Sequence, residues 1–125
     1  MDSLSVKNAV KLRMLTIIGL VVGALGIALL WIAGVAFPIY PPPGIILLLG
    51  GALFVWLVPK GWAPVIGVLL ALFIIVGFLL SPTGIPNLTG ATGVTVAIGQ
   101  AVQLVGVLVA LITGSMALKT NYQKL

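Results

Sequence analysis

The chain has 125 residues, of which 62% are hydrophobic and 6% are charged. Soluble domains carry about 25% charged residues, so this composition excludes an ordinary water-facing surface and indicates that lipid surrounds most of the molecule. The net charge of +5 would fit a nucleic-acid partner. However, the basic residues flank apolar segments and form no aromatic and basic face, so we expect no nucleic acid to bind.

The residue types that carry most protein chemistry are nearly missing. The sequence contains no Cys and no His, and its single acidic residue is Asp2. Disulfides, thiolate chemistry and the commonest zinc and haem ligands are therefore excluded within these residues. A pair of carboxylates for acid and base catalysis is excluded as well. We therefore expect no enzyme activity, no metal site and no cofactor.

The first apolar segment runs from Met14 to Ala36 and follows a polar, basic stretch. At 1.5 Å per residue it spans about 35 Å, enough to cross a hydrocarbon core of about 30 Å. We predict a helix over about residues 12–36. A cleaved signal peptide is the alternative, because small residues at 34–36 resemble a cleavage site. The segment exceeds the usual apolar core of about 7–15 residues, which favours a retained helix.

The second apolar segment is short. Prolines at 38 and 41–43 end the first helix, and we predict a second helix over about residues 43–58. Its uninterrupted apolar part, Ile45 to Val58, spans only about 21 Å. Two interpretations are open: a membrane-spanning helix in a locally thin bilayer, or a re-entrant hairpin.

Two further helices complete the chain. After a turn at residues 59–62, we predict helices over about 63–80 and 92–118. The connection at 81–91 is polar and uncharged, and we expect a loop there that is the best candidate for an external contact. Asn87-Leu88-Thr89 within it matches the N-glycosylation sequon.

The basic residues set the expected topology. With four spans, the N-terminus, the 59–62 turn and the C-terminus share one side. All the basic residues then fall on that side: Lys7, Lys11, Arg13, Lys60, Lys119 and Lys124. The positive-inside rule makes that side cytoplasmic, whereas a re-entrant second segment would separate Lys60 from the others. We predict an all-α membrane protein, a single domain over 1–125 with four transmembrane helices, multi-pass in the cell membrane, with both termini cytoplasmic.

Small residues recur on one face of the first and fourth predicted helices. Their spacing of three or four lets helix backbones approach closely in lipid. We expect packing of these two helices within the chain, with a partner helix or a second copy as the alternative. The predicted packing residues are Gly19, Gly23, Gly26, Gly99, Gly106, Ala110 and Gly114.

Gln100 and Gln103 are the strongly polar side chains within the apolar segments. A buried amide in hydrocarbon needs a hydrogen-bond partner. We expect a structural bond to a neighbouring helix, and the alternatives are a polar point on a substrate path or a contact to a partner subunit.

The predicted function follows from this inventory. No ionisable group lies at membrane depth, which disfavours coupled transport. We predict a non-catalytic accessory or structural subunit that packs against a larger membrane assembly. Its expected partners are the lipid bilayer and a membrane protein, or a second copy bound through the glycine-rich faces. The alternative is a small oligomeric pore or carrier with Gln100 and Gln103 on the passage.

Overall fold

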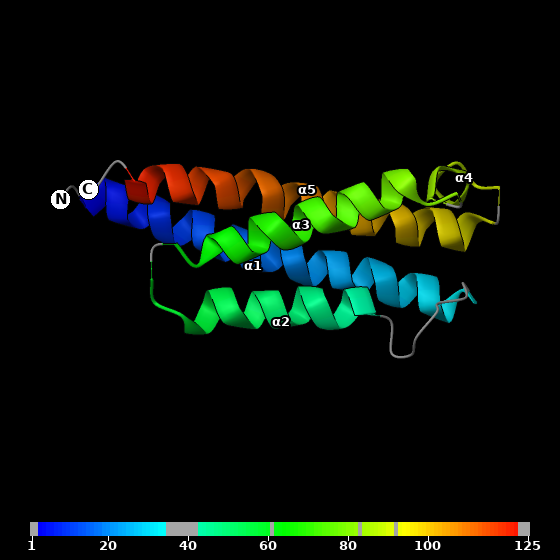
Figure 1. Ribbon diagram of the computed structural model, residues 1–125, viewed down its shortest axis with the longest axis horizontal. Helices are drawn as coiled ribbons and strands as arrows, with labels where there is room; N and C mark the ends of the chain where they lie inside the picture. The colour runs from blue at the N-terminus through cyan, green and yellow to red at the C-terminus, as the bar shows by residue number, and fades with distance from the viewer. Residues whose placement is uncertain (1–2, 35–42, 61, 83, 92, 123–125) are drawn as a thin grey trace.

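The computed structural model describes residues 3–34, 43–60, 62–82, 84–91 and 93–122. Every regular element within these ranges is a helix, so the all-α prediction is confirmed for the described part of the chain. In Figure 1, α1, α2, α3 and α5 lie side by side and alternate in direction. The elements are α1 (Ser3–Ile32), α2 (Pro43–Leu57), α3 (Pro64–Leu80), α4 (Gly84–Leu88) and α5 (Val94–Tyr122).

Helix α1 begins well before the predicted position. It starts at Ser3 rather than near residue 12, because the polar stretch before Arg13 contains good helix formers that extend an already formed helix at little cost. It ends at Ile32, and Gly34 follows with a φ of +93°, a conformation that glycine adopts readily after a helix. The predicted end at residue 36 lies outside the described residues.

Proline marks the limits of the two central helices. Helix α2 begins at Pro43 and α3 at Pro64, where the missing amide hydrogen of proline removes no helical bond. After α3, Ser81 is extended with a ψ of 134°, as expected of a residue before proline. Helix α5 runs on to Tyr122, past the predicted end at residue 118.

The connection predicted as an external loop contains a short helix, α4. Asn87 lies in α4 and is only 7% exposed. The Thr89 hydroxyl donates to the Ile85 carbonyl at 3.0 Å, and Gly90 with a φ of +87° follows. The prediction of a connection without a helix is therefore wrong at residues 84–88, and Asn87 of the sequon is buried.

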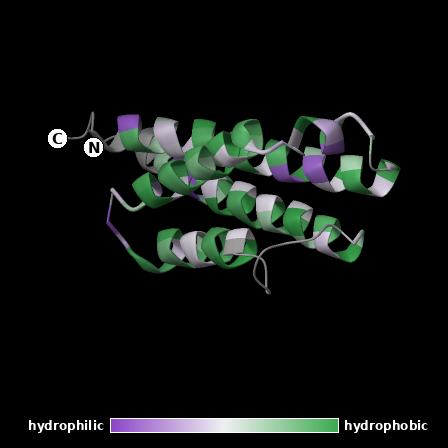
Figure 2. Ribbon diagram, turned by 45° about the vertical axis from the view of Figure 1, so that its right-hand side comes forward, coloured by the Kyte–Doolittle hydropathy of each residue, from purple (hydrophilic) through white to green (hydrophobic). Residues whose placement is uncertain are grey.

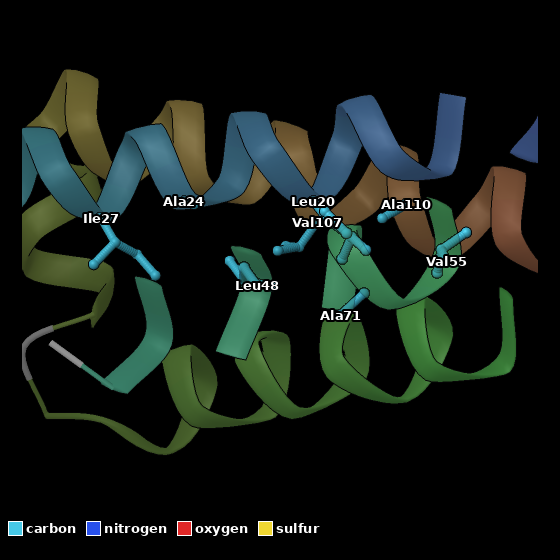
Figure 3. Close-up of a cluster of buried hydrophobic side chains, with 9 residues drawn as sticks. Leu20, Ala24, Ile27, Leu48, Val55, Ala71, Val107 and Ala110 are labelled. Atoms are coloured by element: carbon cyan, nitrogen blue, oxygen red, sulfur yellow. The ribbon is translucent and has the colours of Figure 1, made fainter. Parts of the chain in front are cut away.

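The core lies where α2 and α3 pack against the pair formed by α1 and α5. Figure 3 shows the contributing side chains meeting from these four helices. Most of them are alanine, valine or leucine, so the helices approach closely. The cluster comprises Leu20, Ala24, Ile27, Leu48, Ala52, Val55, Ala71, Val107 and Ala110.

Within the described residues, two helices are long and apolar enough to cross a membrane, judged by length and composition. These segments are Lys7–Ile32 and Val94–Lys119. Helices α2 and α3 are shorter, with 15 and 17 residues, and span about 22 and 25 Å. Figure 2 shows hydrophobic residues along all of these helices.

Arg13 joins α1 to the end of α2. Its guanidinium donates from Nη1 to the Lys60 carbonyl at 3.1 Å, and from Nη2 to the Val58 carbonyl. Carbonyls at a helix C-terminus lack helical partners, and a cation there is favourable. The contact fixes the α2–α3 connection against α1.

The basic residues therefore gather at one end of the bundle. Figure 1 places the start of α1, the α2–α3 connection and the end of α5 at the same end. The described basic residues there are Lys7, Lys11, Arg13, Lys60 and Lys119. The predicted position of Lys124 lies outside the described residues.

Replacing Arg13 tests this contact. We expect Arg13→Gln to lower the free energy of unfolding by about 1–3 kcal/mol, because it removes two charge-assisted hydrogen bonds to terminal carbonyls. The measurement is denaturant titration of the purified protein in mild detergent. Lys11→Gln is the matched control, because Lys11 is exposed and its loss should change stability little. Equal losses in both variants would contradict the specific role of Arg13.

Candidate functional site: the interface of α1 and α5

The small residues of α1 lie directly against those of α5. A Cβ atom added at Gly19 would lie 2.7 Å from the Gly106 carbonyl oxygen and 2.7 Å from the Ala110 nitrogen. A Cβ added at Gly106 would lie 2.8 Å from the Gly23 Cα. Real Cβ atoms do not come this close, so the two backbones touch where these glycines meet.

The same contact continues toward the other end of the pair. A Cβ added at Gly26 would lie 2.5 Å from the Gln103 Cα, and one added at Gly99 would lie 3.1 Å from the Leu30 nitrogen. All these pairs follow one antiparallel register, in which each step forward along α1 matches an equal step back along α5. The interface is therefore continuous from Gly19 to Leu30.

One predicted packing residue has a different neighbour. A Cβ added at Gly114 would lie 2.9 Å from Val68 Cγ2 and 3.5 Å from the Pro64 oxygen, both in α3. Gly67 of α3 in turn faces Thr16 Cγ2, at 2.9 Å from an added Cβ. Gly114 and Gly67 thus let α3 pack onto the α1–α5 pair.

A threonine pair continues this register, and the sequence analysis did not single it out. The Thr16 and Thr113 hydroxyls lie 3.0 Å apart across the two helices. Each hydroxyl also lies within hydrogen-bond distance of a carbonyl of its own helix, Thr16 at 2.8 Å from Leu12 and Thr113 at 2.7 Å from Val109. Because each hydroxyl has one proton, one threonine donates to its own helix carbonyl while the other donates across to it. The sequence did contain a pattern that could have predicted this pair. Thr16 lies three residues before Gly19 and Thr113 lies three residues after Ala110, so each shares a helix face with a predicted packing residue.

Gln100 and Gln103 lie inside the bundle, 5% and 9% exposed. Gln100 Nε2 donates to Gln103 Oε1, so this bond joins two residues of α5 rather than two helices. Figure 2 shows hydrophilic segments of α4 close to those in the first half of α5. No buried side-chain nitrogen or oxygen of the described residues lacks a hydrogen-bond partner.

The chemistry open to this interface is limited. Lys60 is the only Lys, Arg, Asp, Glu or His between residues 14 and 118, and it is exposed in the α2–α3 connection. The polar groups that the interface does contain, two hydroxyls and two amides, bond to one another or to helix carbonyls. The hydroxyl pair links the two helices, the amide pair links two residues of α5, and neither pair carries a charge.

Comparison with known proteins identified no relative of this chain. Neither a protein-family model, nor a curated protein, nor a solved structure matches the chain.

Glycine substitutions test whether the α1–α5 contact holds the bundle together. We expect Gly106→Ala to lower the free energy of unfolding by about 1–3 kcal/mol, because the added methyl group forces two backbones apart. Gly50→Ala is the matched control, since nothing lies within 4 Å of a Cβ added there. It should leave stability unchanged or raise it, because alanine favours a helix by about 1 kcal/mol. Denaturant titration in mild detergent measures the free energy of unfolding of both variants. An unchanged value for Gly106→Ala would contradict the close backbone contact between α1 and α5.

Proposed function

We propose that the chain is a multi-pass protein of the cell membrane with four spans and cytoplasmic termini. In this proposal it serves as a non-catalytic accessory or structural subunit of a larger membrane assembly. The observation that carries the proposal is the outer surface of α2 and α3. With 15 and 17 residues, these helices lie below and at the lower limit of the length of a spanning helix, yet their exposed faces are apolar.

The exposed surface supports immersion in lipid. Large apolar side chains are exposed on each of the four long helices, and soluble proteins rarely expose contiguous apolar patches of such extent. The segments 45–58 and 65–80 contain no Ser, Thr, Asn, Gln or charged residue at all. Examples of exposed residues are Ile32 at 81%, Trp56 at 69%, Phe73 at 64% and Ile112 at 57%.

The distribution of charge supports cytoplasmic termini. The described Lys and Arg residues gather at the end that holds the start of α1 and the end of α5. The opposite end, near α4, has no Lys or Arg among the described residues. By the positive-inside rule the basic end faces the cytoplasm.

The glycine-rich faces first considered for a partner are occupied within the chain. Those of α1 and α5 are buried against each other. The two glutamines are buried as well, which argues against a passage lined by Gln100 and Gln103. A partner protein must therefore bind elsewhere, and we place it on the outer faces of α2 and α3.

Two features favour that place. Helices shorter than the bilayer thickness gain from association, because contact with another protein replaces poorly matched lipid. Gly50 of α2 and Gly77 of α3 are exposed, and nothing lies within 4 Å of a Cβ added at either. Such positions let a further helix approach closely in lipid.

Cysteine labelling tests the topology. The chain contains no Cys, so Lys60→Cys and Thr89→Cys each create a single exposed thiol at opposite ends of the bundle. With an impermeant maleimide on intact cells, we expect labelling at 89 and none at 60 until the membrane is opened. Labelling at 60 from outside would overturn the four-span arrangement.

Purification in mild detergent, followed by mass spectrometry, tests the subunit role. We expect a larger membrane protein to co-migrate in fixed proportion. Replacing both Gly50 and Gly77 by Leu should reduce that protein by more than half, since the new side chains fill the approach surface. Ile112→Leu, a volume-conserving change at an exposed position of α5, is the control. A wild-type chain that migrates alone or only with its own copies would contradict the proposal.

A further inference from the structure

Helices α1 and α5 extend past the rest of the bundle at its basic end. Arg13 lies level with the α2–α3 connection, because it bonds to the Val58 and Lys60 carbonyls. Gly114 lies level with Pro64 at the start of α3. Residues 3–12 of α1 therefore continue about 15 Å further, and residues 115–122 of α5 about 12 Å. Figure 1 shows these ends beyond α2 and α3, and we call them together the basic projection.

The basic projection carries cations that the chain cannot neutralise. Lys7, Lys11 and Lys119 are all exposed. The sequence contains a single acidic side chain, Asp2, against six basic ones. Arg13 adds a fourth charge nearby, although its guanidinium is already bonded to carbonyls. The anions that balance these lysines must therefore come from outside the chain.

Exposed apolar side chains stand beside these lysines. Val10 is 57% exposed, Met14 is 50% exposed and Met116 is 50% exposed. Trp56 and Trp62, 69% and 55% exposed, flank the α2–α3 connection at the same end. A soluble acidic partner would balance the charge but leave these apolar side chains in water. An amphiphile with an anionic head satisfies both kinds of side chain.

We propose that the basic projection binds the headgroups of anionic phospholipids in the cytoplasmic leaflet. The inference rests on the proposed membrane insertion. Measured along the helix axis, Lys11 lies about 3 Å and Lys7 about 9 Å beyond Arg13. The headgroup layer on each side of a bilayer is about 5–8 Å thick, and lysine side chains extend toward it along their apolar stems. The ammonium groups therefore fall within reach of lipid phosphates.

The test uses the full-length protein in vesicles that contain spin-labelled lipid. The relative association of phosphatidylglycerol over phosphatidylcholine is read from the motionally restricted signal at the protein surface. We expect a preference for phosphatidylglycerol on the order of fivefold for each lysine that contributes. Replacing Lys7, Lys11 and Lys119 together by Gln should lower the ratio by about fivefold or more, while Arg13 and Lys60 remain at the same end. Replacing the same three by Arg, which keeps the charge, should preserve it.

Further measurements separate the possible outcomes. Raising the salt from about 0.1 to about 1 M should weaken the preference, because the screening length falls from about 10 to about 3 Å. An unchanged ratio of phosphatidylglycerol to phosphatidylcholine association in the Gln variant would overturn the inference. If free glycerol phosphate competed with phosphatidylglycerol equally well, the ligand would be a soluble phosphate, and the inference would also be overturned. Competition by an acidic polypeptide alone would overturn it too. Failure of the wild type to insert into phosphatidylcholine vesicles would contradict the proposed function instead.

Discussion

The backbone contact between α1 and α5 is the constraint on which the remaining structure depends. In the proposed lipid setting, the hydrophobic effect gives two helices little reason to associate, so close packing and hydrogen bonds must hold them. Glycine at positions 19, 23, 26, 99 and 106 removes the side chains that would keep the backbones apart. The Thr16–Thr113 bond adds a polar contact in the same register. Helices α2 and α3 then pack onto this pair through Leu20, Ala24 and Val107 on one side and Leu48, Val55 and Ala71 on the other.

This way of building the bundle leaves little for chemistry inside it. The glycines at the interface have no side chain that could take part in a reaction. The polar side chains there are already hydrogen-bonded to neighbouring groups. Gln100 and Gln103 illustrate the result, because their mutual bond lowers the cost of burying two amides without opening a path through the protein. What the fold does present outward is apolar surface of two different lengths, long on α1 and α5 and short on α2 and α3. The proposed role in packing against other membrane components rests on that surface.

Helices whose limits follow from hydropathy and proline were predicted from the sequence. The short helix α4, which depends on tertiary contacts, was not. The limits of α2 and α3 follow from Pro43, Pro59 and Pro64, so they were predicted within a residue or two. Helix α4 is only five residues long, contains Pro86 and follows Pro82, and its burial of Asn87 depends on tertiary packing, which no local pattern reveals. The spacing of the glycines indicated the α1–α5 pair. The register that brings Thr16 to Thr113, and the side-chain bond between the glutamines, depend on the relative position of helices far apart in sequence.

Arg13 shows why the position of a charge matters beyond its sign. The positive-inside rule accounts for a cation near the start of α1 but not for its contacts. The planar guanidinium reaches two carbonyls at once, which the single ammonium of lysine does less well. This contact sets the position at which α2 ends along α1. Because Arg13 lies ten residues after the start of α1, that helix continues about 15 Å past the end of α2 at the basic end. At the opposite end Gly44 lies level with Ile27, since a Cβ added at Gly44 would lie 2.7 Å from Ile27 Cδ1, and α1 continues only about 8 Å further. The shortfall in the length of α2 relative to α1 therefore lies mainly at the basic end, where the lysines of α1 project.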